Sequence, residues 1–286
     1  MDGLLWLAYL SIALGVWVGP LWRPRPLPGV TRGRPLAIGH RGVRGALPEN
    51  SMAAFRAALD AGLDGIETDV QRTRDGVLAL VHDPVVAGLR VTDVTFDELR
   101  AQQPDLATLP ELIELMRAHP GTLLNVELKT LDLGGPTTAM LAAELFGPRP
   151  NALARAVAMA LQGSGLEDRA VVSSFSPVAL FHLRRHAPAL RTAYLWSAEP
   201  GVPWPWNRPW PAGLLHADAL HPRHDAATPD AVTRWRARGL RVNVWTVNDA
   251  ADVARVVAAG VDGVMADDPP ALLRAMDRGP AAGATP

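Results

Sequence analysis

Two acidic residues in GIETDVQRTRDGVLALVHDP, residues 65–84, have the spacing of a functional pair. Glu67 and Asp69 are two residues apart in a predicted strand, so both side chains point to the same face. The later stretch NVELK places Glu127 and Lys129 at the same spacing, directly after Asn125 and Val126. Three carboxylates directed at one small volume repel each other, so either some are protonated or a cation neutralises them.

The chemistry of these side chains restricts the kind of cation. The candidate ligands are all oxygens, which favours Mg²⁺ or Ca²⁺ over zinc. A set of separate salt bridges to Arg41, Arg72 and Lys129 is the alternative explanation.

A second apolar run, which ends at His82, follows the acidic pair after only a short turn, and this arrangement suggests a hairpin. GVLALVH, residues 76–82, comes after a short turn that contains Asp75 and Gly76, which is too short for a parallel crossover. We therefore expect residues 65–82 to form an antiparallel hairpin. The simplest register places His82 opposite Glu67 and returns the histidine to the level of the carboxylates.

These residues are positioned by a repeating pattern of strands and helices. Short apolar runs alternate with amphipathic helical stretches from residue 36 onward, and the predicted strands begin at residues 36, 64, 122, 169, 190, 218, 240 and 261. This alternation predicts an α/β fold, a (β/α)₈ TIM barrel with one extra antiparallel strand after the second strand. Asn50 is the predicted N-cap of the first helix, and residues 197–213 show no convincing helix.

Polar residues at the carboxyl ends of barrel strands form active sites in this fold. The first strand ends in His40 and Arg41, and the seventh ends near Trp245. His40 or His82 could instead be a hydrogen-bonded core residue, and Trp245 could simply fill the barrel. His216, His221 and His224 are irregularly spaced, and we expect them to be ordinary surface histidines.

Composition excludes several classes of function. The chain has 286 residues, a formal net charge of -1 and 48% hydrophobic residues, which is typical of a globular protein. The balanced charge gives no reason to expect nucleic acid as a partner. Because there is no cysteine, disulfides, thiolate metal sites and cysteine nucleophiles are excluded.

The N-terminal segment, residues 3–22, carries no charge and is long enough to cross a bilayer as a helix. Only Asp2 precedes it and several arginines follow, so the positive-inside rule predicts a single-pass cell-membrane protein with a cytoplasmic catalytic domain. An export signal of unusual form is the alternative. The predicted organisation is an anchor over residues 1–22, a Pro/Arg-rich linker over 23–35, a catalytic domain over 36–277 and a flexible tail over 278–286.

A second segment suggests contact with a membrane. VPWPWNRPWPAG, residues 202–213, carries Trp204, Trp206 and Trp210 among prolines. Exposed tryptophans favour a membrane interface or a protein surface, although these could also pack on the outside of the barrel in place of the missing helix.

Taken together, the motifs resemble the glycerophosphodiester phosphodiesterases, within the phosphatidylinositol-phosphodiesterase-like TIM-barrel superfamily. The resemblance covers residues 36–272 and rests on AIGHRG, PENS, AGLDGIETDV, DGVLALVHDP, NVELK, VNVWTVND and GVDGVMADDP. The departures are Ser51, where the family usually has threonine, and Leu63, where it usually has alanine.

The resemblance implies a role for each matching residue. It implies the metal ligands Glu67, Asp69 and Glu127, the general acid and base His40 and His82, and the phosphate- or substrate-binding residues Arg41, Lys129 and Trp245. It leaves Glu49, Asn50, Asn125 and Asn248 as supporting residues.

The implied reaction is metal-dependent hydrolysis of a small glycerophosphodiester to an alcohol and glycerol 3-phosphate. One histidine would deprotonate the nucleophile and the other would protonate the leaving oxygen. The alternatives are a lysophospholipase D or sphingomyelinase D-like activity on membrane lysolipids, and a non-catalytic barrel that binds headgroups.

Overall fold

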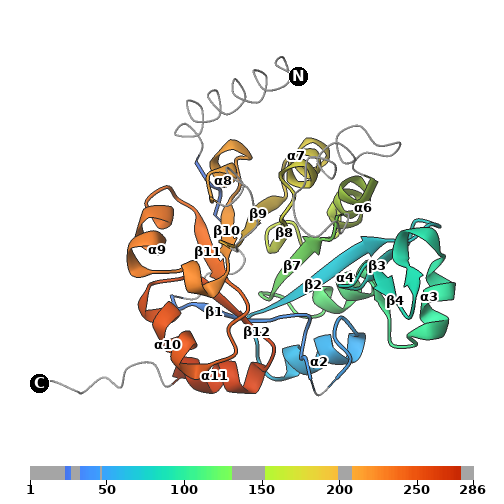
Figure 1. Cartoon of the computed structure of the whole chain (residues 1–286), viewed down its shortest axis with the longest axis horizontal. Helices are drawn as coiled ribbons and strands as arrows, with labels where there is room; N and C mark the ends of the chain where they lie inside the picture. The colour runs from blue at the N-terminus through green and yellow to red at the C-terminus, as the bar shows by residue number, and fades with distance from the viewer. Residues whose placement is uncertain (1–22, 27–32, 46, 131–151, 199–207, 278–286) are drawn as a thin grey trace, which may run out of the picture.

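Eight parallel strands close into a barrel in the computed structural model, which describes residues 23–26, 33–45, 47–130, 152–198 and 208–277 (Figure 1). Each barrel strand pairs in parallel with its neighbours, and β1 pairs with both β12 and β2, which closes the sheet. The barrel strands are β1 (Leu36–Gly39), β2 (Gly65–Arg72), β7 (Leu123–Leu128), β8 (Ala170–Ser174), β9 (Arg191–Trp196), β10 (Ala219–Pro222), β11 (Arg241–Val244) and β12 (Gly263–Ala266). The predicted TIM barrel is thereby confirmed, and each strand begins within two residues of its expected start.

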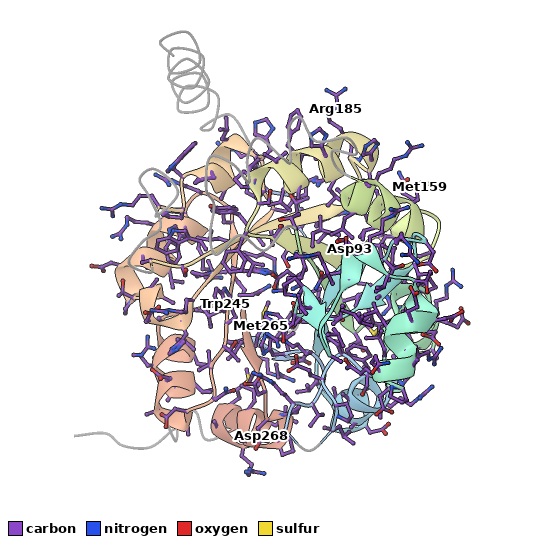
Figure 2. All side chains as sticks on the ribbon, turned by 45° about the vertical axis from the view of Figure 1, so that its right-hand side comes forward. Asp93, Met159, Arg185, Trp245, Met265 and Asp268 are labelled. Carbon is purple, nitrogen blue, oxygen red and sulfur yellow. The ribbon has the colours of Figure 1, made fainter. Side chains whose placement is uncertain are left out.

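Helices cover the outside of the barrel. They are α2 (Met52–Asp60), α4 (Leu109–Arg117), α6 (Ala152–Leu161), α7 (Pro177–His186), α8 (Pro211–Leu214), α9 (Pro229–Arg236), α10 (Ala250–Ala258) and α11 (Pro269–Asp277). Figure 2 shows Trp245 and Met265 near the centre of the barrel, whereas Met159 and Arg185 lie on its outer surface.

The start of the first helix differs from the prediction. Ser51, and not Asn50, is the N-cap of α2, because the Ser51 hydroxyl accepts a hydrogen bond from the backbone N–H of Ala54. Asn50 has a positive φ of 56°, and its side chain turns toward β2 instead. Asn50 therefore does not cap the helix, and its side chain contacts Asp69 and Thr68 of β2 instead.

The strand after β2 runs antiparallel to it. β3 (Leu78–Leu80) pairs with β2 so that Leu80 lies opposite Val70. This register is one residue away from the expected one, because continuing it would place His82 opposite Thr68 rather than Glu67. β3 also ends before His82, so the histidine belongs to the loop that follows.

A small insertion extends from this point before the chain returns to the barrel. It contains β4 (Val85–Val86), β5 (Leu89–Arg90), the 3₁₀ helix η3 (Val91–Asp93), α3 (Phe96–Gln102) and β6 (Ala107–Thr108). β6 pairs antiparallel with β3, which attaches the insertion to the barrel sheet. In Figure 1 the insertion lies to one side of the barrel, next to β3 and α4.

Two apolar layers hold the barrel together. One fills its interior and consists of Leu36, Ile38, Leu123, Val171, Ala193, Ala219 and Met265. A larger layer lies between the strands and the helices, where residues of the other strand face, such as Ile66, Val70 and Val126, are fully buried. Among the described residues, polar side chains face inward at the carboxyl ends of the strands and in the layer directly below them.

The described part of the linker is attached to the barrel through Arg25. Its guanidinium forms an ion pair with the buried Asp218, with 2.8 Å between Nη2 and Oδ2, and donates to the carbonyl of Leu190. The segment predicted as a linker is thus held at residues 23–26 against the amino-terminal ends of β9 and β10.

Within these described ranges, no helix has the length and apolar composition needed to cross a bilayer. The longest, α6 and α7, have 10 residues each, which corresponds to about 15 Å, half the thickness of the hydrocarbon core. This contradicts the predicted single-pass location in the cell membrane, and we correct that prediction. The predicted anchor (3–22), Trp204, Trp206 and the predicted tail (278–286) lie outside the described residues.

Candidate active site

Three carboxylates meet at the carboxyl ends of β2 and β7. Glu67, Asp69 and Glu127 are all buried, and each offers an oxygen that lies within 4.8 Å of the other two. The strands bring them together directly, because Asp69 lies opposite Glu127 in the parallel register. The clustering expected from the spacing of the sequence is therefore observed.

Two cations lie against these carboxylates. Lys129 Nζ is 3.1 Å from Asp69 Oδ1 and 2.7 Å from Glu127 Oε1, and Arg41 Nε is 3.0 Å from Asp69 Oδ2. Burial by itself would raise the pKa of Asp69, but Lys129 and Arg41 outweigh it and lower the pKa. Burial would also lower the pKa of Lys129, but its two carboxylate partners raise it above the usual range. Asp69 and Lys129 are thus both charged.

Glu67 is the carboxylate without a cation of its own. Its Oε2 accepts a hydrogen bond of 3.0 Å from the backbone N–H of Arg41, whereas its buried Oε1 has no hydrogen-bond partner among the described residues. Burial, followed by the charges of Asp69 and Glu127, raises its pKa well above the usual value. When all three carboxylates are ionised, Lys129 and Arg41 leave one negative charge uncompensated. The unpartnered Oε1 and this excess charge fit a divalent cation held by the triad.

His40, at the end of β1, is oriented by an aspartate from β12. Its Nδ1 is 2.6 Å from Asp267 Oδ1, and its Nε2 lies 4.0 Å from Glu67 Oε2. Asn248 fixes Asp267 by donating from Nδ2 to Oδ2 and accepting from the Asp267 backbone N–H. Asn248, predicted only as a supporting residue, thus contacts the histidine's partner.

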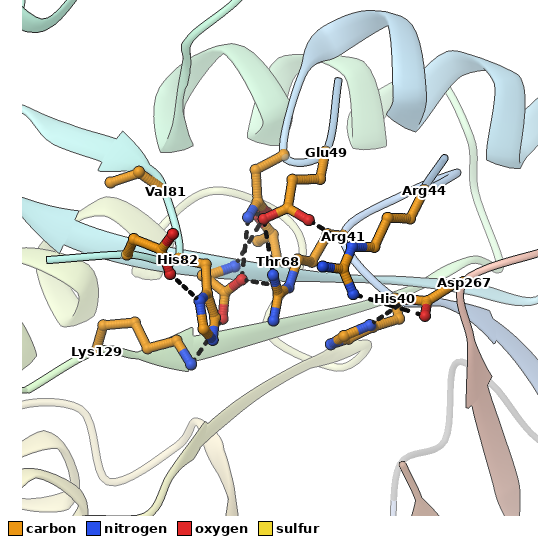
Figure 3. Close-up of polar contacts among 12 residues, drawn as sticks. His40, Arg41, Arg44, Glu49, Thr68, Val81, His82, Lys129 and Asp267 are labelled. Carbon is orange, nitrogen blue, oxygen red and sulfur yellow. Dashed lines mark hydrogen bonds and ion pairs between the residues drawn. The ribbon is translucent and has the colours of Figure 1, made fainter. Parts of the chain in front are cut away.

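His82 lies near the carboxylates from the other side, in the loop after β3. Its Nδ1 is 2.7 Å from Asp83 Oδ1. Gln71 fixes this loop, because its side-chain amide donates to the carbonyls of Val81, His82 and Asp83. In the view of Figure 3, His40 and His82 lie on opposite sides of Arg41.

The loop after β1 carries the residues that hold Arg41. Arg41 has a positive φ of 55°, and its Nη1 donates to Glu49 Oε1 over 2.7 Å. Arg44 Nε binds the other oxygen of Glu49 at 2.7 Å. Asn50 donates to Asp69 Oδ2 and accepts from the Thr68 hydroxyl. Glu49 and Asn50 therefore fix the arginine and the central aspartate.

Two predicted residues lie farther from the triad. Trp245 packs edge-on against Phe175, with ring centroids 5.5 Å apart, and forms an apolar wall at the ends of β8 and β11. Asn125 lies one layer deeper than Glu127 on β7, where its amide donates to the Ser173 hydroxyl. Asn125 therefore belongs to the barrel interior beneath the site.

One histidine that was expected on the surface is fully buried. His221 has no exposed surface, its Nε2 lies 3.1 Å from Asn243 Nδ2, and burial lowers its pKa to about 3. It faces the barrel interior because β10 places every second residue inside. Gly263 leaves room for this layer, since a Cβ there would lie 2.6 Å from Asn243 Oδ1.

Sequence reasoning missed Asp267 and Gln71. Asp267 is adjacent to His40 only because the closure of the barrel brings β12 next to β1, which local spacing does not reveal. The signal in the sequence was that Asp267 directly follows a predicted strand. Gln71 carried the same signal as Glu67 and Asp69, since all three occupy alternate positions of β2.

A closed parallel barrel with a buried acidic triad and two aspartate-paired histidines at the carboxyl ends of its strands defines a TIM-barrel enzyme. The model of the glycerophosphoryl diester phosphodiesterase family matches residues 40–271, and the chain belongs to this family. It is a glycerophosphodiester phosphodiesterase, a phosphoric diester hydrolase.

Individual relatives agree with this assignment. The chain is 30% identical over 260 residues to a glycerophosphodiester phosphodiesterase from Caldanaerobacter subterraneus subsp. tengcongensis, an alignment that covers 85% of this chain and 98% of the relative. A probable glycerophosphodiester phosphodiesterase 1 from Mycobacterium tuberculosis is 32% identical, with coverage of 78% and 86%.

Solved structures show the same fold. The crystal structure of a glycerophosphoryl diester phosphodiesterase from Silicibacter pomeroyi matches with a TM-score of 0.72 and 27% identity, covering 91% of this chain and 97% of that one. A phosphodiesterase from Oleispira antarctica, solved in complex with the product sn-glycerol-3-phosphate, matches with a TM-score of 0.70 and 25% identity over 86% and 98% of the two chains.

Proposed function

We propose that the chain is a divalent-metal-dependent phosphodiesterase that splits small glycerophosphodiesters into an alcohol and glycerol 3-phosphate by acid–base catalysis with His40 and His82. The observation that carries this proposal is the buried triad of carboxylates, with histidines paired to aspartates beside it. The Oleispira relative's complex with glycerol 3-phosphate supports the proposed product.

Glu67, Asp69 and Glu127 are the residues that would hold the cation. Their hard oxygen donors suit Mg²⁺ or Ca²⁺. When bound, such an ion supplies Lewis-acid neutralisation of charge on the phosphoryl oxygens.

The side chains of the protein perform the remaining tasks. A phosphodiester anion repels nucleophiles, so cations that face its oxygens lower the barrier. Arg41 and Lys129 are fixed by carboxylates on both sides, which keeps their charges in place without reorganisation. Trp245 and Phe175 form an apolar wall beside this site, suited to the carbon skeleton of glycerol.

Each histidine has an aspartate at Nδ1, which orients the ring and leaves Nε2 as the atom that exchanges a proton. One Nε2 removes the proton of the attacking hydroxyl, and the other donates a proton to the leaving oxygen. The attacking hydroxyl belongs to water or to the glycerol itself. The first step needs these two proton transfers in either case, and attack by the glycerol leaves a cyclic phosphate that water then opens.

The test is an assay of the full-length chain with glycerophosphocholine and with lysophosphatidylcholine, in Mg²⁺, in Ca²⁺ and in chelator. We expect metal-dependent release of glycerol 3-phosphate from glycerophosphocholine, which His40→Ala reduces at least about 100-fold. His186→Ala, at an exposed histidine at the end of α7, is the matched control and should leave the rate unchanged.

Other outcomes would contradict the proposal. Turnover of the lysolipid alone would assign a lysophospholipase D-like activity instead. Binding of the metal without turnover of either substrate would indicate a barrel that only binds headgroups.

A further inference from the structure

Arg44 contacts the carboxylates that hold two functional side chains. The first is Glu49, whose Oε2 lies 2.7 Å from Arg44 Nε and whose Oε1 accepts a hydrogen bond from Arg41. The second is Asp267, whose Oδ2 lies 3.7 Å from Arg44 Nη1 and whose Oδ1 contacts His40. Figure 3 shows the Arg44 guanidinium between these two carboxylates. One guanidinium thus links the residue that holds Arg41 to the residue that holds His40.

The backbone of the loop after β1 brings Arg44 to this position. The backbone N–H of Arg44 donates to the carbonyl of Asp267 over 2.9 Å. The backbone N–H of His40 donates to the carbonyl of Ala266 over the same distance. The loop is therefore bound to the end of β12 at two points of its main chain, and the side chain of Arg44 leaves from the second of them.

The two carboxylates differ in how much they depend on Arg44. Asp267 is also held by Asn248, which donates to the same Oδ2 over 2.7 Å. The Glu49 side chain is 30% exposed, and among the described residues its carboxylate pairs only with Arg41 and Arg44. Without Arg44, Glu49 can therefore turn toward solvent and release Arg41. Asp267 stays held through its other partner.

These contacts of Arg44 contribute more to geometry than to stability. The Arg44 side chain is 46% exposed, and ion pairs at such positions add little to the free energy of unfolding because solvent screens them. Catalysis is more sensitive, since a displacement of about 1 Å in a group that faces the substrate is enough to slow the reaction. The loss of Arg44 should therefore affect the rate far more than the stability.

We propose that Arg44 is a positioning residue for the hydrolysis of the diester. Through Glu49 it keeps Arg41 in place to face the phosphate. Through Asp267 it helps to orient the ring of His40. This inference rests on the function proposed above, because it assigns Arg44 a role within that reaction. Arg44 acts through the two carboxylates and does not itself bind the substrate.

The first test removes the guanidinium. Arg44→Ala should lower kcat/KM for glycerophosphocholine about tenfold, measured by the release of glycerol 3-phosphate. The midpoint of urea unfolding should stay near that of the wild type. Arg90→Ala is the matched control, because Arg90 is 52% exposed and pairs with Asp93 in the insertion. This control should leave both quantities unchanged.

Two measurements separate the geometry of the guanidinium from its charge. Added guanidinium ion, below the concentrations that unfold the protein, should raise the activity of Arg44→Ala about threefold, whereas sodium chloride at the same concentration should not. Arg44→Lys keeps the charge, but an ammonium lacks the planar fork that faces two carboxylates, so it should recover only part of the lost rate. Arg44→Lys also supplies the comparison with the wild type if Arg44→Ala does not fold.

The second test is a pair of double-mutant cycles, which show whether Arg44 acts through its partners. Glu49→Ala should lower kcat/KM by itself, and adding Arg44→Ala to it should change the constant by less than about twofold. Asn248→Ala removes the other residue that holds Asp267 Oδ2. Combined with Arg44→Ala, it should therefore lower kcat by more than the product of the two single effects.

The outcomes distinguish this inference from the proposed function. If the wild type hydrolyses the diester and Arg44→Ala does so equally well, Arg44 is not a positioning residue and the proposed function stands. The same conclusion follows if the effects of Arg44→Ala and Glu49→Ala on kcat/KM simply multiply. If the wild type releases no glycerol 3-phosphate, the proposed function fails and this inference fails with it.

Discussion

Glu67 is the carboxylate of the triad that pairs with neither Lys129 nor Arg41 through its side chain. Its buried Oε1 has no partner in the described part of the chain, and its pKa is raised well above the usual value by burial and by the two neighbouring carboxylates. A buried carboxylate that lacks compensation destabilises the folded chain unless it takes up a proton or a cation. The stability of the protein should therefore depend on the charge at this one position.

Replacing Glu67 by glutamine should separate stability from metal binding. In chelator, Glu67→Gln should raise the free energy of unfolding at neutral pH by about 1 kcal/mol, because it removes like-charge repulsion. With added Mg²⁺ or Ca²⁺ the wild type should be stabilised, whereas the variant should not respond. Urea unfolding with and without metal measures both effects.

Glu114→Gln is the matched control, because Glu114 is an exposed glutamate paired with Arg117. Its stability should be unchanged in chelator, and it should respond to metal as the wild type does. An equal response to metal in Glu67→Gln would remove Glu67 from the ligand set.

Asp267 is predicted to position His40. The short contact between His40 Nδ1 and Asp267 Oδ1 fixes the ring so that Nε2 faces the site. Asp267→Asn should lower kcat about 100-fold or more with little change in KM, because the misoriented ring exchanges protons poorly while the substrate contacts remain. Steady-state kinetics with glycerophosphocholine measures the two constants.

A second variant tests whether Asp267 acts through orientation. Asn248→Ala removes the residue that holds Asp267 and should lower kcat less than Asp267→Asn does. An unchanged kcat in Asp267→Asn would exclude the positioning role.

At the scale of single residues, the sequence predicted those contacts that follow from strand geometry. Glu67 and Asp69 share a face because they alternate on one strand, and Glu127 joins them through the parallel register. The partner of His40 depends on how the barrel closes, and His221 was misplaced because the room beside Asn243 comes from Gly263 on another strand. The roles of these residues in catalysis stay predictions.

The elements that carry the site depend on one tightly packed turn after β1. Gly42 has a φ of +84°, and a Cβ there would lie 2.7 Å from the backbone carbon of Ala54 in α2. Gly45 also has a positive φ, of +96°, but a Cβ there would meet nothing within 4 Å. Replacing either glycine by alanine therefore strains the backbone, but only the replacement of Gly42 also causes a steric clash.

This pair gives a controlled test of how the turn positions Arg41. Gly45→Ala should cost about 1 kcal/mol of stability and leave activity near that of the wild type. Gly42→Ala should cost about 2 kcal/mol more, and it should also lower kcat/KM, because α2 or the loop with Arg41 must move. Equal effects of the two substitutions on stability and rate would contradict this account.

The hairpin after β2 shows how far an element can be predicted. The short turn at Asp75 and Gly76 indicated an antiparallel return, and β3 does pair antiparallel with β2. The exact opposition of His82 and Glu67 was wrong because the register of β2 and β3 is shifted by one residue and β3 ends at Leu80. The insertion that follows then sets the position of His82, and short pairings such as β4 with β5 leave little trace in the sequence.

For the whole molecule, the closed barrel was predicted because eight strand–helix repeats permit few other folds. The strand–helix repeats do not show which side chains fill the interior of the barrel. Apolar residues such as Ile38 and Met265 form one interior layer, whereas Asn125, His221 and Asn243 place polar groups beneath the site. Within the described ranges, the buried Oδ1 atoms of both asparagines and the buried Nδ1 atom of His221 have no hydrogen-bond partner.

This polar interior should make the fold sensitive to acid through His221. Burial lowers the pKa of His221 to about 3, whereas an unfolded histidine titrates near 6.5. Between these values the unfolded chain binds a proton that the folded chain does not, so the free energy of unfolding falls as the pH falls below about 6.5. The loss from this residue should approach about 1.4 kcal/mol per pH unit and should end below the folded pKa.

Urea unfolding of His221→Gln between pH 7.5 and pH 4.5 measures this contribution. The variant should be less stable than the wild type at pH 7.5, because glutamine fits the interior less well. Its stability should nevertheless fall by about 2 to 3 kcal/mol less over this range, because glutamine does not titrate. His186→Gln, at an exposed histidine, should keep the slope of the wild type. If His221→Gln keeps that slope too, the buried ring does accept a proton, and the interior beneath the site must contain a group or water that stabilises the charge.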